Sequence, residues 1–530
     1  MKRYDLIVIG AGPAGLCAAI EAAEKGMVVA VFDENSRPGG QLFKQIHKFF
    51  GSKEHKAKIR GFNIGNELLE DANSLGVDVH LNSVVIGIYE PLRVTVNEGD
   101  HITSYAGDNI IVATGANENM IPFEGWTLPG VMGAGAAQTL MNLHGVKPGN
   151  NILMVGSGNV GLVVSYQLMQ AGCNVVAIID AATRIGGYGV HASKVARAGI
   201  PFYLSHTIVK AEGNEKVEKV TIAQVDKWWK FIEGTQKTFN VDTICMAVGL
   251  SPMSQLTKMA GCTMVDKGGL VPKCDEYGQT SIDGLFAAGD VAGIEEASSA
   301  MIGGRIAALA AAKRSGFINE EKFTELEAEQ GLSLDKLRKG MFCHENKGRT
   351  DIFKTDEGYN LSIGLLEKGF IADDEILKFP AACYVKKGPH PVIECTQNIP
   401  CNPCQDACKV GCIMVGDVIT KIPEVVEDRK CINCGMCVAA CSGQAIFILD
   451  EDYEEGFATV TLPYEFYPLP KEGDMGLGLS RDGKYECDAE VVSVKVNKVF
   501  DHTNLLTIKI PKEYAMKVRF YKGKDVDKND

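Results

Sequence analysis

Two glycine-rich segments constrain the fold of this 530-residue chain more than any other feature. The first, at residues 10–15, follows the apolar run 5–9, and the second, at residues 156–161, follows the apolar run 151–155. A dinucleotide pyrophosphate binds where a helix N-terminus presents free N–H groups, and glycine lets the backbone approach it closely. The repeated pattern therefore predicts two Rossmann-type βαβ units, each with a dinucleotide site.

The first glycine-rich fingerprint has a matching carboxylate at the end of the next apolar run. The fingerprint residues expected to contact the dinucleotide are Gly10, Gly12, Pro13, Ala14 and Gly15. Asp33 lies 23 residues after Gly10, where a carboxylate accepts hydrogen bonds from an adenosine ribose. The neighbouring Glu34 is an alternative for this role. The sequence thus predicts a phosphate site and a ribose site close to the N-terminus.

The second fingerprint repeats this arrangement in the middle of the chain. Its expected contacts are Gly156, Gly158, Asn159, Val160 and Gly161. Asp180 follows Gly156 by 24 residues, and a carboxylate there favours the unphosphorylated ribose of NAD(H) over NADP(H). Arg184 close by keeps NADP(H) open. A cofactor fold retained only as a spacer is the alternative interpretation.

Three further short motifs accompany the first fingerprint along the chain. They supply the candidate residues Gly40, Gln41, Ala113, Thr114, Gly115, Gly289 and Asp290. The four motifs together resemble the two-dinucleotide flavoprotein superfamily that includes thioredoxin reductase. The resemblance implies FAD at the first site, with Asp290 hydrogen-bonded to its ribitol chain. Because residues 126–145 and the stretch after Gly40 lack cysteine, we do not expect the disulfide reduction known in that superfamily.

Nine of the seventeen cysteines lie between Cys395 and Cys441. A secreted disulfide framework disperses its cysteines through a short chain, so this crowding favours metal binding in a reducing compartment. Four thiolates reach the corners of a [4Fe-4S] cube from a C-x2-C-x2-C pattern and a remote fourth cysteine. Two such motifs are present, the first with a longer opening gap: Cys395, Cys401, Cys404 and Cys408, then Cys431, Cys434, Cys437 and Cys441.

In two-cluster ferredoxins the fourth cysteine of each motif binds the other motif's cluster. This rule predicts one cluster on Cys395, Cys401, Cys404 and Cys441, and the other on Cys408, Cys431, Cys434 and Cys437. Cys412 aligns with Ala445 of the second repeat. It is therefore either a spare small residue near a cluster or a substitute ligand for Cys395. Zinc is the alternative metal, because CxxC pairs also bind it.

Charge and hydropathy exclude several classes of partner. The net charge of −13 opposes binding to nucleic acid and to anionic lipid. The apolar stretch 6–19 contains three glycines in a strand-turn-helix pattern, so we expect it to be core rather than a signal or membrane segment. We therefore expect a cytoplasmic protein with no membrane insertion and no nucleic-acid partner.

The order of the motifs predicts an α/β protein with several domains. Two Rossmann-like domains, an FAD domain with an inserted NAD domain, come first. An α+β two-cluster ferredoxin-like module and a small C-terminal β domain follow. The predicted boundaries are 1–118 and 251–317 for the FAD domain, 119–250 for the inserted domain, 318–390 for a connector, 391–455 for the cluster module and 456–530 for the β domain.

A second resemblance rests on residues 121–131, residues 293–301 and the pair Gly304-Arg305. These segments look like the α subunit of heterotetrameric sarcosine oxidase and the related subunits of opine and other amino-acid (proline) dehydrogenases and of hydrogen cyanide synthase. The cysteine segment resembles versions of this subunit in anaerobic bacteria. The likeness implies a hetero-oligomer in which a second FAD-dependent dehydrogenase subunit oxidises an amine or imino acid. A further partner implied by the likeness is a small iron-sulfur subunit.

The function expected from these motifs is electron transfer between a nicotinamide cofactor, FAD and two [4Fe-4S] clusters inside an amine or amino-acid dehydrogenase complex. Hydride transfer between nicotinamide and flavin is chemistry of the cofactors, so no catalytic acid or base is predicted. Two alternatives stay open. One is a self-contained NAD(P)H:acceptor reductase, as the small subunit of glutamate synthase is for its partner. The other is a non-catalytic scaffold whose clusters only connect two other subunits.

Overall fold

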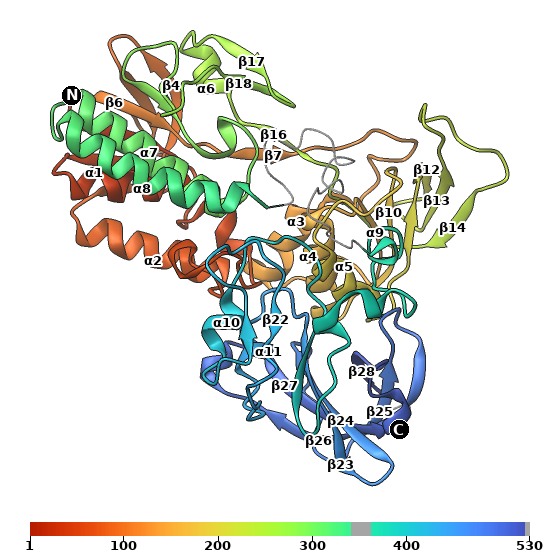
Figure 1. Ribbon diagram of the computed structural model, residues 1–530. Helices are drawn as coiled ribbons and strands as arrows, with labels where there is room; N and C mark the ends of the chain where they lie inside the picture. The colour runs from red at the N-terminus through yellow and green to blue at the C-terminus, as the bar shows by residue number, and fades with distance from the viewer. Residues whose placement is uncertain (341–361, 525–530) are drawn as a thin grey trace. The chain divides into compact units, whose positions relative to one another are not determined.

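The computed structural model describes residues 1–340 and 362–524, which fold into two compact units (Figure 1). Unit 1 consists of Met1–Phe49, Ile59–Asn119 and Gly249–Lys339. Unit 2 consists of Phe50–Lys58, Met120–Val248 and the described part of Gly340–Asp530. The chain thus passes from unit 1 into unit 2 for residues 50–58 and again for residues 120–248, returns to unit 1 each time, and then ends in unit 2.

Unit 1 is built on a seven-stranded sheet in the order β3-β2-β1-β6-β5-β4, with β19 paired to β6. Strands β3, β2, β1, β6 and β19 run parallel, whereas β4 and β5 are antiparallel to their neighbours. The strands are β1 (Arg3–Ile9), β2 (Val29–Phe32), β3 (Asp78–His80), β4 (Val84–Tyr89), β5 (Arg93–Asn97), β6 (Ile102–Val112) and β19 (Leu285–Ala287). The predicted apolar runs at residues 5–9 and 28–32 are therefore adjacent strands of one parallel sheet.

The α-helices of unit 1 are α1 (Pro13–Glu24), α2 (Gly61–Ser74), α6 (Gln255–Met259), α7 (Ala297–Arg314) and α8 (Glu320–Arg338). Helix α7 packs against α1 and α8 against α7 (Figure 1). The α1–α7 contact depends on a residue without a side chain, because a Cβ at Gly304 would lie 2.0 Å from the Ala14 carbonyl oxygen. Gly304 therefore lets α7 approach the start of α1, beside the first fingerprint.

Unit 2 contains a second parallel sheet in the order β11-β10-β9-β15-β8. Its strands are β8 (Val131–Gly133), β9 (Asn151–Val155), β10 (Asn174–Asp180), β11 (Phe202–Leu204) and β15 (Thr243–Met246). Its helices are α3 (Ala134–His144), α4 (Asn159–Gln170) and α5 (Gly189–Ala196). A three-stranded antiparallel sheet of β12 (His206–Glu212), β13 (Lys219–Gln224) and β14 (Lys237–Asn240) is formed by the chain between β11 and β15. This βαβ repeat is the second predicted Rossmann unit.

The C-terminal part of unit 2 is one seven-stranded antiparallel sheet in the order β20-β23-β24-β27-β26-β25-β28 (Figure 1). Its strands are β20 (His390–Ile393), β23 (Ile446–Glu454), β24 (Phe457–Tyr464), β25 (Met475–Leu479), β26 (Tyr485–Lys495), β27 (Asn504–Pro511) and β28 (Phe520–Gly523). The cysteine-rich segment connects β20 to β23 and carries two short helices, α10 (Pro403–Ala407) and α11 (Met436–Ala440). The cysteine segment and the C-terminal strands therefore share a sheet.

The connector predicted at 318–390 is partly helical where the structure describes it, and residues 369–389 are mostly turns and loops. It includes α8 and the short helix α9 (Ile363–Lys368), and residues 341–361 lie outside the described residues. Within the two described ranges, every helix is too short or too polar to cross a membrane.

Candidate functional site

The first fingerprint forms a tight turn at the N-terminus of α1. Gly10 has a φ of +108° and a Cβ there would lie 2.4 Å from the Ala113 carbonyl oxygen, while a Cβ at Gly15 would lie 1.8 Å from the Gly10 oxygen. A Cβ at Gly12 would instead point into open space. Two of the glycines thus hold strand, helix and the 113–115 turn together, and the third leaves a face open at the helix N-terminus.

Asp33 is held beside this turn. Its Oδ2 accepts the Ala11 N–H at 2.5 Å and its Oδ1 accepts the Asn35 N–H at 2.7 Å. The Asp33 side chain is almost buried, whereas Glu34 is exposed. Of the two predicted ribose ligands, Asp33 is the one fixed next to the fingerprint, and the assignment of the ribose contact itself stays a prediction.

The other predicted flavin motifs surround the same helix end. Gly39 donates its N–H to the Ala11 oxygen at 2.7 Å, and a Cβ at Gly40 would lie 3.0 Å from the Gly12 Cα. Thr114 donates its hydroxyl to the Met253 oxygen at 2.8 Å. Gln41 by contrast has an exposed side chain. The structure therefore brings the fingerprint together with the backbone of residues 39–40.

Asp290 lies at the start of the turn before α7, in the same region. A Cβ at its neighbour Gly289 would lie 2.9 Å from the Ala14 Cβ. Burial raises the pKa of Asp290 to about 6, and the Glu295 N–H donates to its Oδ1 at 3.2 Å. A half-satisfied, desolvated carboxylate is suited to accept a hydrogen bond from a ligand hydroxyl. These residues fit the ribitol contact that the resemblance implies.

The second fingerprint has nearly the same geometry. Cβ atoms at Gly156 and Gly161 would lie 2.2 Å from the Ala247 oxygen and 2.0 Å from the Gly156 oxygen, and a Cβ at Gly158 would again meet nothing. Asp180 Oδ2 accepts the Ser157 N–H at 2.7 Å and the Ser157 hydroxyl at 2.6 Å. Asp180 thus occupies the position that Asp33 has in unit 1.

One element of the second site was not predicted from the sequence. Gly187 donates its N–H to the Ser157 oxygen at 2.9 Å, as Gly39 does to Ala11 in unit 1. The Tyr188 N–H then bonds the Asn159 side-chain oxygen at 2.8 Å. The signal was available, because a Gly-Gly pair begins six residues after Asp180 just as one begins six residues after Asp33. The two sites are therefore related beyond their fingerprints.

Comparison with known proteins bears on this paired arrangement. The sequence model of the pyridine nucleotide-disulphide oxidoreductase family matches residues 4–316. This chain belongs to that family. Membership identifies it as an FAD-dependent oxidoreductase. All the cysteines that the structure describes are nevertheless free thiols.

The chain is similar to subunits of several bacterial enzymes. Hydrogen cyanide synthase subunit HcnB of Pseudomonas aeruginosa is 31% identical over 327 residues, covering 57% of this chain and 69% of that protein. An opine oxidase subunit of Agrobacterium tumefaciens is 30% identical, covering 58% of this chain and 65% of that protein. The alpha subunit of sarcosine oxidase from a Corynebacterium species is 27% identical, covering 59% of this chain and 33% of that protein. The predicted resemblance to this group is confirmed.

Among solved structures, the thioredoxin reductase of T. acidophilum aligns with a TM-score of 0.51 and 22% identity, covering 59% of this chain and 99% of that protein. At this identity the likeness shows the fold alone. It confirms the predicted pair of Rossmann-like units of the thioredoxin reductase type. The ferredoxin-like character predicted for the cysteine segment stays a prediction.

The cysteine segment repeats in space as it does in sequence. Helices α10 and α11 each have five residues, with Cys404 and Cys437 as their second residues. A cysteine directly follows each helix, and its sulfur accepts a hydrogen bond from the backbone N–H of the residue four positions later. The Cys412 N–H donates to the Cys408 sulfur at 3.1 Å, and the Ala445 N–H donates to the Cys441 sulfur at 3.4 Å. The alignment of Cys412 with Ala445 thus corresponds to equivalent backbone positions.

The thiols gather into two sets of four. Burial raises the pKa of the Cys401 thiol well above its usual value, and three nearby thiols raise it further: Cys404, Cys441 and Cys395. Burial likewise raises the pKa of Cys437, and the thiols of Cys431, Cys408, Cys434 and, last, Cys404 raise it further. We call Cys395, Cys401, Cys404 and Cys441 the first thiol set, and Cys408, Cys431, Cys434 and Cys437 the second thiol set. The crossed assignment of these thiols to two clusters stays a prediction.

Cys412 belongs with the second thiol set. Its neighbours Cys408 and Cys431 raise its pKa after burial has done so. The thiols that act on Cys395 are instead Cys441 and Cys404, and whether Cys412 is a spare residue or a ligand stays open.

Four cysteines in each thiol set supply the donors that a [4Fe-4S] cluster requires. In the described ranges, no group of three or more His, Cys, Asp or Glu side chains is placed to hold a metal ion. Four thiolates in a dry pocket repel one another unless a positively charged group lies among them. The buried polar atoms Thr396 Oγ1 and Gln397 Nε2, beside Cys395, have no partner within the described residues. Both are available to a group held at the first thiol set.

Proposed function

We propose that this chain is the electron-transferring subunit of an amine or amino-acid dehydrogenase complex, with FAD in unit 1 and NAD(H) and two [4Fe-4S] clusters in unit 2. The observation that carries the proposal is the division of eight cysteines into two sets of four in a chain that belongs to an FAD-dependent oxidoreductase family. FAD exchanges a hydride with nicotinamide and single electrons with iron-sulfur clusters, so it connects the two kinds of carrier.

The residues that would hold FAD are those around the N-terminus of α1. The N–H groups at the open face of Gly12 are placed for the pyrophosphate, Asp33 for the adenosine ribose and Asp290 for the ribitol. In unit 2, the open face of Gly158 and the Asp180 carboxylate would hold NAD(H) in the same way. The exposed Arg184 is the residue that would accept the 2′-phosphate of NADP(H) instead.

A short segment relates the flavin motifs to the first thiol set. Phe50–Lys58 follows Gly40-Gln41 closely in the chain but belongs to unit 2. Phe50, like Cys395, Cys401 and Cys441, packs against the small apolar cluster that includes Tyr188. The Gly51 backbone hydrogen-bonds the Cys401 thiol, and the Gly51 oxygen accepts the Asn402 N–H at 3.1 Å. Because this segment is joined directly in the chain to the flavin motifs, we propose the first thiol set as the entry point for flavin electrons.

The second thiol set is suited to pass electrons out of the chain. Cys434 is exposed, whereas Cys404 and Cys437 are buried and no other thiol of either set is fully exposed. Electron transfer between proteins requires a carrier near the surface, so a partner would meet the second cluster at Cys434. The order that follows is nicotinamide or partner flavin, FAD, first cluster, second cluster, or its reverse.

The relatives support a hetero-oligomer. Three proteins similar to this chain are named as subunits, of hydrogen cyanide synthase, opine oxidase and sarcosine oxidase. By analogy, a second FAD-dependent dehydrogenase subunit would oxidise the substrate, and a small iron-sulfur subunit would complete the complex. The free thiols support a reducing compartment such as the cytoplasm.

Anaerobic titration with NADH tests the proposal. We expect stoichiometric NADH to bleach the flavin absorbance and then to reduce the clusters, seen by electron paramagnetic resonance (EPR). A Gly158→Val variant, whose side chain would enter the open face of the second fingerprint, should lose the response to NADH and keep its flavin. An unresponsive flavin in fully loaded wild-type protein would favour the scaffold alternative. Turnover with a soluble acceptor and without a companion subunit would favour the self-contained reductase.

A further inference from the structure

A row of buried positive charges runs beside the first thiol set. Arg197, which follows α5, is 4% exposed, and its guanidinium donates to the Gln444 oxygen at 2.9 Å. The Arg197 Cζ lies 5.3 Å from the centre of the Phe447 ring, and the Arg519 Cζ lies 5.1 Å from the same ring. Phe447 is thus a shared neighbour of two guanidinium groups that are far apart in the sequence of unit 2.

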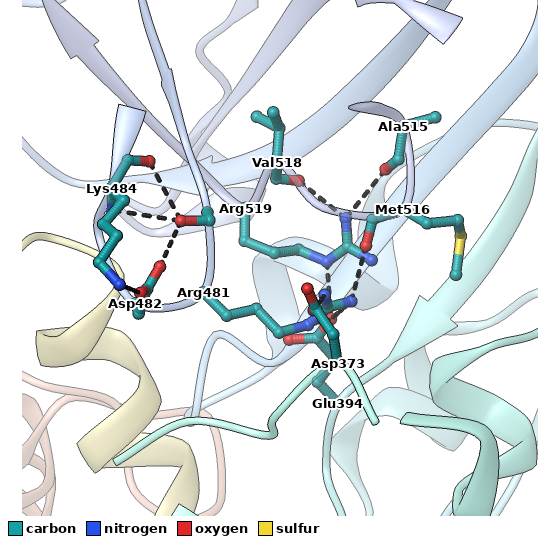
Figure 2. A network of polar contacts seen from close by, with 10 residues as sticks. Asp373, Glu394, Arg481, Asp482, Lys484, Ala515, Met516, Val518 and Arg519 are labelled. Atoms are coloured by element: carbon teal, nitrogen blue, oxygen red, sulfur yellow. Dashed lines mark hydrogen bonds and ion pairs between the residues drawn. The ribbon is translucent and has the colours of Figure 1, made fainter. Parts of the chain in front are cut away.

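The row continues through a buried carboxylate (Figure 2). Glu394 Oε1 accepts the Arg519 Nε–H at 2.7 Å and the Arg481 Nε–H at 2.9 Å. Asp373 also reaches Arg481, at 3.4 Å, but its side chain is 74% exposed. Three buried guanidinium groups are therefore balanced by one buried carboxylate. Burial lowers the pKa of Arg519 only to about 10, so it stays charged at neutral pH.

Two cysteines of the first thiol set lie close in the chain to a residue of this row or to its hydrogen-bond partner. Glu394 directly precedes Cys395. Gln444, which accepts the Arg197 hydrogen bond, lies in the turn after Cys441, where the Ala445 N–H reaches the Cys441 sulfur. Within residues 1–340 and 362–524, Arg197 has no carboxylate at ion-pair distance. Burial lowers the pKa of Arg197, and Tyr166, Glu394 and Cys441 oppose that shift, so its charge acts on the first thiol set as well as on the shared carboxylate.

We propose that Arg197, with Arg481 and Arg519, compensates the negative charge of the first cluster and raises its reduction potential. The inference rests on the proposed function, because it requires a cluster on the first thiol set. Reduction adds one negative charge to a cluster whose four thiolates already make it anionic, and a nearby buried cation stabilises the more negative state. The second thiol set includes the exposed Cys434, where water screens fixed charges. Arg197 therefore acts as a positioning and charge-compensating residue for one cluster only.

Redox titration of the full chain, prepared anaerobically and followed by EPR, tests the inference. The key variant is Arg197→Gln, which can still donate to the Gln444 oxygen but has no charge. Arg197→Lys keeps the charge, and Arg429→Gln removes an exposed arginine two residues before Cys431. A Cys434→Ser variant marks the signal of the second cluster.

At a fixed potential, Arg197→Gln should lower the ratio of reduced to oxidised first cluster about tenfold, which is about 59 mV for a one-electron couple. The second cluster should not move. Arg197→Lys should recover most of the wild-type potential, and Arg429→Gln should change either ratio by less than about twofold. Together these results would show that the charge of Arg197, and not only its packing, affects the potential of the first cluster.

An unchanged first-cluster potential in Arg197→Gln, or equal potentials in Arg197→Gln and Arg197→Lys, would overturn the inference. If Arg197→Gln does not load its clusters, the variant Gln444→Glu replaces it as the test. Gln444→Glu adds a negative charge at the same turn. It also keeps an acceptor for the Tyr166 hydroxyl, which donates to Gln444 Oε1 at 2.9 Å. That variant should lower the first-cluster potential, and no shift would contradict us. Wild-type protein without iron would defeat the proposed function itself, which is a different outcome.

Discussion

The two thiol sets share a local structure and differ in what surrounds them. Each motif has a five-residue helix followed by a cysteine whose sulfur accepts an N–H from four residues on. Three cysteines of the first thiol set pack with Phe50 against a cluster that includes Tyr188, with buried arginines nearby, whereas the second set reaches the surface at Cys434. The repeat in sequence thus fixes how the thiols lie, and the elements packed around each set determine its contact with water and charge.

Removing one ligand from each set should have the largest effect. We expect Cys401→Ser and Cys434→Ser each to reduce the iron content from about eight to about four per chain. Cys401→Ser should also block reduction of the remaining cluster by the flavin, because the first cluster is the proposed entry point. Cys434→Ser should leave flavin-to-cluster electron transfer intact.

Iron analysis and stopped-flow absorbance after flavin reduction measure both quantities. Identical kinetic behaviour of the two serine variants would break the proposed order of the clusters.

The second largest effect is expected from chelation, which should remove iron from the two thiol sets at different rates. Cys434 is exposed while Cys401, Cys404, Cys441 and Cys395 are shielded to a greater degree, so an oxidant with a chelator should remove the second cluster first. EPR spectra at increasing times would show which signal disappears. Simultaneous loss of both signals would mean that the difference in exposure has no consequence for cluster access.

Truncating the aromatic contact of the first thiol set should have a moderate effect. Phe50→Ala removes a partly buried ring that packs against the same apolar cluster as Cys395, Cys401 and Cys441. We expect a loss of about 1–3 kcal/mol in the free energy of unfolding of unit 2, less than for a fully buried phenylalanine, and slower reduction of the first cluster. Phe231→Ala, at a 50% exposed ring of the same unit, is the matched control for thermal unfolding and should change little.

The smallest effect is expected at Cys412. Its thiol is buried beside the second thiol set, so Cys412→Ala should cost about 1 kcal/mol through the lost sulfur contact. Iron and sulfide content should equal that of the wild type. A loss of about four iron atoms per chain would instead make Cys412 a ligand and revise the composition of the sets.

The local features of this molecule could be predicted from the sequence because their spacing is dictated by chemistry. The glycines of both fingerprints lie at the predicted strand-helix turns, whereas the crossed grouping of the cysteines stays a prediction of the ferredoxin rule. Asp33 and Asp180 are placed by the same logic, since one helix and one strand separate each from its fingerprint and bring it back beside the turn.

What the sequence could not reveal depends on contacts between distant segments. Arg197, Glu394 and Arg519 are far apart in the chain and come together only when α5, β20 and β28 pack within unit 2. The position of Phe50–Lys58 beside the first thiol set is likewise a tertiary contact. The sharing of one sheet by β20, β23 and the C-terminal strands was hidden because strand patterns do not specify which strands pair.

The most direct test of the central claim is metal and flavin analysis of anaerobically purified full-length protein together with EPR after dithionite reduction. We predict about eight iron and eight sulfide per chain, one FAD, and spectra of two neighbouring [4Fe-4S] clusters with magnetic coupling. Zinc in place of iron, four iron atoms in a single cluster, or an absence of flavin in folded protein would contradict the account.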